Sequence, residues 1–368
     1  MKTKIKNIFT IVLSGILVFG GGLWFILKES EVYSESERRK LEELPKISAE
    51  NVFSGKYMKD FENASPDQFP MRDTLRKIAT LSRLSIFQKS DSNNIFYTDN
   101  HLSKLNYPLD ENMLSHAAER FENIYTQYLE NTDTKLYFSV VPDKNMFLAQ
   151  ENGYLSIDYN YMINNMKDKT AYMKYIDITD LLSADDYYRT DTHWKQECIT
   201  DVADRLAESM NTELSRNYEK LTLDTPFYGV YHGQSALDTE ADKLTYLTNE
   251  ELSNAVVTIY PNGTAEKSVI YNTELAAGKD GYEMFLSGSQ PLVEIENPLC
   301  KNEKELVIFR DSYASSLAPL LVSGYSKITL IDTRYMYPSV IPAFVEFKNQ
   351  DVLFLYSSLI LNSSLGIQ

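Results

Sequence analysis

Three short apolar runs near the C-terminal end constrain the fold of this chain more than any other feature. They are ELVIF at residues 305–309, KITLI at 327–331 and DVLFLY at 351–356. Uninterrupted apolar runs of this length are typical of parallel strands, which are buried on both faces. KLYFSVV at residues 135–141 is a similar run, and patterns with helical spacing lie between such runs. Strands that alternate with helices predict an α/β fold with a doubly wound, mostly parallel sheet.

The texture of the sequence changes between residues 214 and 302. Helical periodicity fades there, and short strand patterns at residues 243–247, 256–260 and 292–295 stand between turn residues such as the Pro-Asn-Gly at 261–263. We interpret residues 214–302 as a β-rich insertion of the main domain, placed near the site as a flap.

An uncharged stretch of twenty residues, 8–27, stands near the N-terminus. Its length matches the thickness of a bilayer, so it predicts one N-terminal transmembrane helix. Lys2, Lys4 and Lys6 precede it, which orients the N-terminus to the cytoplasm. A cleaved signal peptide is the alternative. We therefore expect a single-pass protein of the cell membrane with an anchor at residues 1–28, a stalk at 29–45 and an extracytoplasmic domain at 46–368.

The charge and the metal-binding residue types exclude several functions. The net charge is −16, which argues against nucleic acid as a partner. His101, His116 and His232 have no spacing typical of a metal site, so we expect neither a metal nor a cofactor. Cys198 and Cys300 could pair in an oxidising compartment, but we favour two buried free thiols.

The segment VIFRDSYASSLAPLL at residues 307–321 carries the first candidate catalytic residue, Ser312. An apolar strand ends just before this serine, and a helical pattern begins just after it. Open α/β sheets bind their ligands at the carboxyl ends of strands, and a helix N-terminus stabilises a developing oxyanion. The alternative is that Ser312 only caps the helix, as serines commonly do.

The segment YYRTDTHWK at residues 187–195 carries the second candidate, an Asp-x-His loop. In such a loop the carboxylate of Asp191 can orient the imidazole of His193 and stabilise it when it takes up a proton. Trp194 beside it could wall the site or stack on a sugar ring. The alternative is that Asp191 or Thr192 caps a helix that continues through Gln196.

Several motifs together resemble the DHHW family, whose members are similar to SGNH-like O-acetyltransferases of the alginate type. They are SGK and DQFPMRD early in the chain, VVPDKNMFL at 140–148, DTHW at 191–194, FYGVYH at 227–232, and RDSYASSLAPLL followed by IDTRYMY late in the chain. The resemblance covers about residues 40–360. It implies an SGNH-hydrolase-like fold in which Ser312 is the nucleophile, His193 the general base and Asp191 its orienting partner.

The resemblance also implies a function and its partners. We expect an O-acetyltransferase that modifies a cell-surface polysaccharide or exopolysaccharide through an acyl-enzyme, with a membrane-bound O-acyltransferase as the acetyl donor. An acetyl-polysaccharide esterase with the same residues and a degenerate polysaccharide-binding or scaffold protein are the alternatives.

The chain departs from the family pattern at two positions. Thr192 stands in place of the first histidine, and Arg310 in place of the usual glycine. The backbone N–H of Ser312, helped by Asn145 or Arg310, is then the expected oxyanion donor. Further polar residues that we expect near the substrate are Lys144, Tyr188 and Arg334; Asp143 and Tyr335 adjoin two of them. For these residues a structural role is the alternative.

Overall fold

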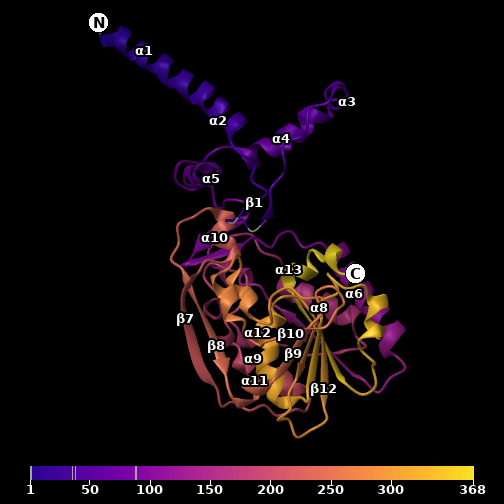
Figure 1. The fold of residues 1–368 in the computed structure, drawn as a ribbon. Helices are drawn as coiled ribbons and strands as arrows, with labels where there is room; N and C mark the ends of the chain where they lie inside the picture. The colour runs from indigo at the N-terminus through magenta and orange to yellow at the C-terminus, as the bar shows by residue number, and fades with distance from the viewer. Residues whose placement is uncertain (1, 35, 38, 88) are drawn as a thin grey trace. The chain divides into compact units, whose positions relative to one another are not determined.

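The computed structural model describes residues 2–34, 36–37, 39–87 and 89–368 (Figure 1). The chain divides into two compact units. Unit 1 comprises Met1–Ser92 and Gly233–Asp238, and unit 2 comprises Asn93–His232 and Thr239–Gln368. The domain boundaries predicted at residues 28 and 45 stay predictions.

Unit 2 is built on an eight-stranded sheet with the strand order β10-β9-β11-β13-β12-β14-β5-β6. The central strands are those predicted from the apolar runs, which confirms them. In spatial order the strands are β10 (Glu266–Ser268), β9 (Val256–Ile259), β11 (Leu292–Glu296), β13 (Lys327–Ile331), β12 (Glu305–Arg310), β14 (Asp351–Ser357), β5 (Lys135–Val141) and β6 (Lys174–Tyr175).

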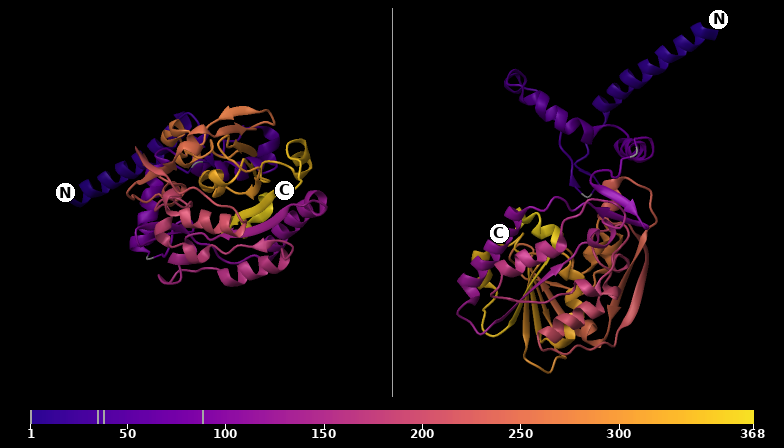
Figure 2. Two further views of the ribbon diagram at one scale, coloured as in Figure 1. Left: turned by 90° about the horizontal axis from the view of Figure 1, so that it is seen from below. Right: turned by 180° about the vertical axis from the view of Figure 1, so that it is seen from behind.

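Helices cover both faces of this sheet, as the two further views show (Figure 2). Alternate residues of one strand point into two separate cores: Leu306 and Ile308 of β12 pack with α9 and α12, whereas Val307 and Phe309 pack with α6 and α8. Such burial on both faces is the reason that the runs lack polar alternation. The helices of unit 2 are α6 (Glu111–Ile124), α7 (Asn145–Leu148), α8 (Tyr159–Lys169), α9 (Thr200–Ser209), α11 (Glu250–Asn254), α12 (Ala314–Leu321) and α13 (Ser358–Leu361). A further helix, α10 (Val230–Ser235), begins in unit 2 and ends in the 233–238 segment of unit 1.

The sheet is mixed, with a block of parallel strands, as predicted, and an antiparallel extension at one edge. β13, β12, β14, β5 and β6 pair in parallel, but β11 pairs antiparallel with β13, and β9 and β10 continue antiparallel from there. Two strands predicted for a separate insertion therefore extend the main sheet. They do so because β11 is apolar enough to lie beside β13 inside the sheet, with three of its five residues buried.

The rest of residues 214–302 does form structure outside the main sheet. β7 (Glu219–Phe227) and β8 (Asp242–Thr248) make an antiparallel pair, and the 3₁₀ helix η8 (Gly281–Met284) packs in a small core with Phe227 and Leu244. β3 (Ile95–Thr98) and β4 (His101–Lys104) form another pair. Cys198 and Cys300 are free thiols, as predicted, but both are half-buried, not fully buried.

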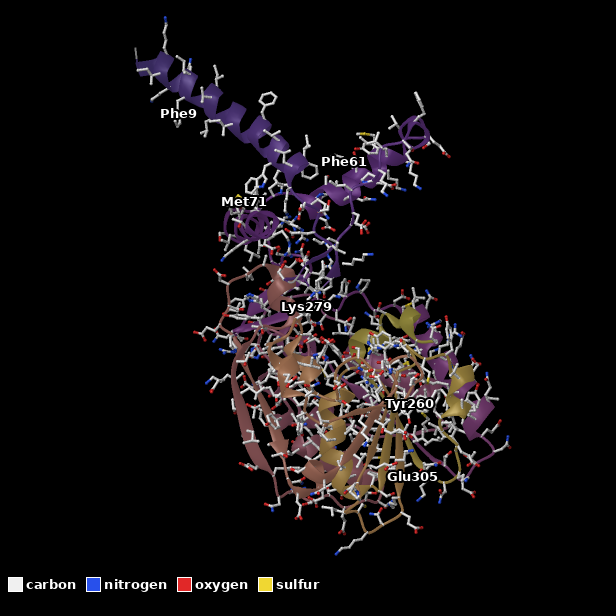
Figure 3. All side chains as sticks on the ribbon, viewed as in Figure 1. Phe9, Phe61, Met71, Tyr260, Lys279 and Glu305 are labelled. Carbon is white, nitrogen blue, oxygen red and sulfur yellow. The ribbon has the colours of Figure 1, made fainter. Side chains whose placement is uncertain are left out.

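Unit 1 is mostly helical. Its elements are α1 (Lys2–Gly15), η1 (Ile16–Gly20), α2 (Gly21–Leu27), β1 (Tyr33–Ser34), β2 (Arg39–Lys40), α3 (Ala49–Phe53), α4 (Lys56–Gln68), α5 (Arg72–Leu81) and η2 (Ser82–Ile86). Arg39 forms a two-pronged ion pair with the buried Asp67, with N–O distances of 2.8 and 2.5 Å. The ring of Phe25 meets that of Phe61 edge-on, with centroids 6.0 Å apart. Phe61 lies on α4 and is labelled in Figure 3.

The predicted transmembrane helix over residues 8–27 is wrong. In the part of the chain that the structure describes, no helix has the length and apolar character needed to cross a membrane. The α-helix that starts at Lys2 ends at Gly15, a π-helical turn follows over Ile16–Gly20, and α2 is only seven residues long. Fourteen residues of α-helix span about 21 Å, short of a bilayer core of about 30 Å. Glycines at 15, 20, 21 and 22 give the backbone the freedom to leave the α-helical pattern.

Candidate active site

Polar side chains gather where four neighbouring strands end. Ser312 follows β12, Arg334 follows β13, Ser358 follows β14, and Lys144 follows β5. These strands are parallel and adjacent, so their carboxyl ends lie at one edge of the sheet. Open α/β sheets place their sites at this edge.

Three of the predicted residues form one hydrogen-bonded series at this edge. The Nε2 atom of His193 lies 2.7 Å from the Oγ atom of Ser312, and its Nδ1 atom lies 2.6 Å from Oδ1 of Asp191. Asp191 and His193 are buried, and Ser312 is half-buried. The carboxylate therefore holds the imidazole in the orientation that points Nε2 at the serine hydroxyl, which is the arrangement that proton transfer from serine needs.

The alternative capping roles of these residues do not match the structure. The residue at the N-cap of α12 is Tyr313, whose own side chain makes no capping hydrogen bond. The residue at the N-cap of the 3₁₀ helix Gln196–Cys198 is Lys195, again without a side-chain cap. The hydroxyl of Ser312 and the carboxylate of Asp191 are thus directed to His193.

The two ends of the loop that carries His193 are paired with each other. Tyr187 and Trp194 form a β-bridge, and the N–H of Tyr188 donates to the carbonyl of His193 at 3.0 Å. In the middle of the loop, the buried carboxylate of Asp242 accepts from the N–H and the hydroxyl of Thr190 at 2.8 and 2.6 Å. These bonds fix the loop backbone, so the imidazole does not depend on its own contacts alone for its position.

Trp194 anchors this loop to α12. Its Nε1 donates to Oγ of Ser316 at 3.0 Å and to the carbonyl of Tyr313 at 3.2 Å, and the side chain is fully buried. A fully buried indole cannot stack on a sugar ring. The predicted role of Trp194 as a wall for the substrate is therefore replaced by a structural one.

The second carboxylate oxygen of Asp191 is held by the start of α10. The N–H of Val230 donates to Oδ2 of Asp191 at 2.8 Å, and the N–H of Gly229 donates to the hydroxyl of Thr190 at 2.8 Å. A Cβ atom at Gly229 would lie 2.2 Å from the Cβ of Asp191, so only glycine allows this close approach. Gly229 and Val230 belong to the motif FYGVYH, but nothing in the sequence around them indicated that they contact Asp191.

Three tyrosines surround the imidazole and its neighbour Thr192. The ring of Tyr282 stacks on His193 with centroids 3.7 Å apart and planes within 4°, and Tyr313 lies at 5.1 Å. The hydroxyl of Tyr231 donates to that of Thr192 at 3.0 Å, and the hydroxyl of Tyr313 donates to the Thr192 carbonyl at 2.7 Å. Sequence reasoning missed these rings. Tyr313 adjoins Ser312 and could have been found there, whereas Tyr282 gives no local signal.

Arg310 lies fully buried behind Ser312 in a group of charged residues. Its Nη1 donates to Oγ of Ser315 at 3.2 Å and lies 3.7 Å from Asp332, and its Nη2 donates to the carbonyl of Gln290. Burial lowers the pKa of Arg310, and the carboxylate of Asp332 opposes this. Arg334 binds the same Asp332 with both prongs, at 2.9 and 2.6 Å. Both guanidinium groups are therefore paired within the protein.

Asn145 and Tyr188 are directed to other contacts than Ser312. The amide of Asn145 donates to Ser156 at 3.2 Å and to the hydroxyl of Tyr159 at 3.4 Å. The ring of Tyr188 is fully buried and meets Phe227 edge-on at 5.0 Å. Asp143 is also buried and accepts hydrogen bonds from Asn106, Tyr159 and Ser358. The structure thus gives these three residues packing and hydrogen-bonding roles beside the site.

Lys144 is buried beneath the loop of His193. Its Nζ donates to the carbonyls of Tyr188 and Arg189 at 2.7 and 3.2 Å and lies 5.2 Å from the ring centre of Tyr231. Burial lowers the pKa of Lys144 to about 7, although Asp191 and Asp242 favour the charged form. Lys144 is thus a support of the loop backbone, out of reach of solvent.

The buried lysine predicts a pH-dependent stability. Between pH 7 and 10 the unfolded chain keeps the proton on Lys144 and the folded chain releases it, so the free energy of unfolding rises with pH. We expect this lysine to add about 4 kcal/mol across that range. The stability conferred by neutral Lys144 is lost as the pH falls towards 7, and below 7 its contribution stays constant.

Urea unfolding of the wild type and of Lys144→Met at several pH values measures this effect. The variant cannot titrate at this position. The free energy of unfolding of the wild type minus that of the variant should therefore rise as the pH increases from 7 to 10. Parallel curves for the two proteins would show that Lys144 stays charged in the fold.

Comparisons with known proteins agree with this fold. No family model matches the sequence, and no curated protein matches it. A DHHW family protein from Eubacterium siraeum has 23% identity and a TM-score of 0.61, over 75% of this chain and 95% of that one. The predicted resemblance to the DHHW family is confirmed.

Two further solved structures are similar to this chain. Bacillus cereus PatB1, solved with a sulfonyl adduct, has 20% identity and a TM-score of 0.59, over 73% of this chain and 95% of that one. The O-acetyltransferase domain of Pseudomonas putida AlgJ has 12% identity and a TM-score of 0.42, over 68% and 84%. At such identities the likeness to the DHHW protein and PatB1 concerns the fold.

Proposed function

We propose that this chain is an O-acetyltransferase that acetylates hydroxyl groups of a polysaccharide through an acetyl-Ser312 intermediate. The observation that carries the proposal is the hydrogen-bonded series from Ser312 through His193 to Asp191 at the carboxyl edge of the sheet. The acetyl chemistry and the polysaccharide come from the motif resemblance to alginate-type O-acetyltransferases. The predicted location outside the cytoplasm stays a prediction.

The first half-reaction forms the acetyl-enzyme. The Nε2 atom of His193 takes the proton of the Ser312 hydroxyl while Oγ attacks the carbonyl carbon of the acetyl donor. Asp191 stabilises the imidazolium that results. The imidazolium then gives its proton to the leaving group, and the acetyl group remains on Oγ. We propose a membrane-bound O-acyltransferase as the source of the acetyl group.

The second half-reaction transfers the acetyl group. His193 takes the proton of an acceptor hydroxyl, whose oxygen attacks the acetyl carbon, and the proton returns to Oγ as the ester bond to Ser312 breaks. A sugar hydroxyl as acceptor gives transfer, and water gives hydrolysis.

The backbone N–H of Ser312 is the donor that we propose for the oxyanion of both tetrahedral intermediates. The next N–H groups along the chain have acceptors within the turn: Tyr313 donates to Oδ1 of Asp311, Ala314 to the Asp311 carbonyl, and Ser315 to the Ser312 carbonyl. Ser312 also precedes α12, whose dipole favours negative charge at this end. Arg310 contacts the backbone just before this donor, since its Nη1 donates to the carbonyl of Asp311 at 3.4 Å.

Acetyl transfer is tested with p-nitrophenyl acetate as donor and a mixture of oligosaccharides as acceptors. We expect the protein to carry one acetyl group on Ser312, located by peptide mass spectrometry, and to pass it to an oligosaccharide faster than to water. Acetate as the sole product would favour the esterase. The absence of any acetyl on Ser312, with glycan binding intact, would favour the degenerate binding protein.

A sulfonyl fluoride gives an independent test of the nucleophile. PatB1 has been solved with a sulfonyl adduct, and this chain shares its fold. We expect phenylmethylsulfonyl fluoride to modify Ser312 and to block acetylation of the protein. Modification elsewhere, with acetylation unchanged, would argue against Ser312 as the nucleophile.

A further inference from the structure

Tyr282 has a contact with His193 that neither the motifs nor the resemblance assign. Its phenol ring lies flat on the imidazole, with centroids 3.7 Å apart and planes within 4°. Tyr282 comes from η8, 89 residues along the chain from His193. The face of the imidazole that Tyr282 covers is closed to water, since both side chains are buried.

The position of Tyr282 is set by several contacts. Its hydroxyl donates to Oγ of Ser316 at 2.8 Å and lies 3.4 Å from the carbonyl of Ser312. Its ring packs against Phe285, with centroids 5.1 Å apart. A Cβ atom at the preceding Gly281 would come within 2.9–3.1 Å of Ala276, Phe227 and Leu244, so glycine lets η8 lie close against this core.

We infer that Tyr282 is a positioning residue, whose ring face holds the imidazole of His193 and stabilises its protonated form. This inference rests on the proposed general-base role of His193. Proton transfer from Ser312 makes an imidazolium in a buried place, where the loss of hydration disfavours the charge. The negative face of an aromatic ring attracts a cation, so the phenol ring replaces water on that side.

The stack and the carboxylate act on different parts of the imidazole. Asp191 binds its edge at Nδ1, and Tyr282 covers its face. The groups that face His193 are Asp191 from its own loop, Tyr282 from η8, and Ser312 and Tyr313 at the start of α12. Burial raises the pKa of the hydroxyls of Tyr282 and Tyr313, so both rings stay neutral. Lys144 and Asp242 bind the loop backbone behind the imidazole.

The inference is tested by titrating His193 in the full chain. The protein has only four histidines, so ring-labelled histidine gives few NMR signals, and His193→Gln assigns the relevant one. We expect the His193 pKa in Tyr282→Leu to lie about 0.5 to 1 below that in Tyr282→Phe, because only phenylalanine keeps the ring face. Equal pKa values in the two variants would overturn the inference.

Turnover of p-nitrophenyl acetate is the second readout. We expect kcat/KM to fall about tenfold in Tyr282→Leu and to change less than about twofold in Tyr282→Phe. The ascending limb of the pH profile of Tyr282→Leu should move to lower pH, in step with the NMR titration. Tyr282→Leu could lose activity while the His193 pKa stays the same, both by NMR and in the pH profile of turnover. Tyr282 would then have only a packing role, which contradicts the inference.

A third variant serves if Tyr282→Leu does not fold. Pentafluorophenylalanine at position 282 keeps the shape of the ring but reverses the charge distribution on its face. It should lower the His193 pKa relative to phenylalanine, and an unchanged pKa would overturn the inference. Failure of the proposed function would look different. In that case the wild type would turn over p-nitrophenyl acetate no faster than Ser312→Ala does.

Discussion

The Ser312→Ala variant should lose acetyl transfer by about 10⁴-fold or more, because it lacks the hydroxyl that His193 activates for attack on the acetyl donor. In the wild type the Oγ atom of Ser312 lies 2.7 Å from Nε2 of His193, and the residue is half-buried. Removal of this one atom therefore leaves no large cavity. The melting temperature should therefore stay close to that of the wild type. Both quantities are measured on the purified chain, by release of p-nitrophenol and by calorimetry.

Ser323→Ala is the matched control for this substitution. Ser323 is also half-buried and lies just beyond α12, where its hydroxyl accepts from the N–H of Ser215. We expect its activity to remain within about twofold of the wild type. Equal turnover in Ser312→Ala and Ser323→Ala would exclude Ser312 as the nucleophile and remove the basis of the proposed mechanism.

The Gly229→Ala variant should lose both stability and activity. The new Cβ would lie 2.2 Å from Cβ, 2.4 Å from Cα and 2.5 Å from N of Asp191, so the backbone of one of the two segments must move. We expect unfolding to become easier by about 3 kcal/mol or more. Since Val230 binds Oδ2 of Asp191, the displacement also disturbs the carboxylate, and a shift of 1 Å costs about 100-fold in rate.

Gly366→Ala is the control for the loss of a glycine. The nearest atom to its new Cβ is Cγ of Arg334 at 3.9 Å, which is ordinary contact. Its free energy of unfolding should change by less than about 1 kcal/mol. Urea unfolding and turnover of both variants decide the prediction, which is wrong if Gly229→Ala is as stable and as active as Gly366→Ala.

The strands of the central sheet were predictable because their signal is local. An unbroken apolar run such as β13 (Lys327–Ile331) reports burial on both faces, whatever its neighbours are. The pairing direction of β11 was not predictable, since a short apolar run can join a sheet in either direction. The N-terminal helix was predicted wrongly because hydropathy counts apolar residues but does not show where a glycine-rich segment leaves the α-helical pattern.

Ser312, His193 and Asp191 could be named as candidates from the sequence alone, but Ser312 and Asp191 each had an alternative role as a helix cap. What separates the two roles is the direction in which a side chain points. The structure directs the Ser312 hydroxyl to His193 and puts Tyr313, not Ser312, at the N-cap of α12. Trp194 shows the reverse case, since a residue expected to face the substrate is buried against Ser316.

The sequence by itself determined that the chain is an α/β protein, that Ser312 follows a buried strand, and that Asp191 and His193 share one loop. These properties depend on residues close to one another in the chain, where periodicity and spacing act. Only the tertiary structure decided that Tyr282 lies on His193 and that Gly229 touches Asp191. Such contacts join segments that many residues separate, and packing of the whole unit brings them together. No local pattern contains that information.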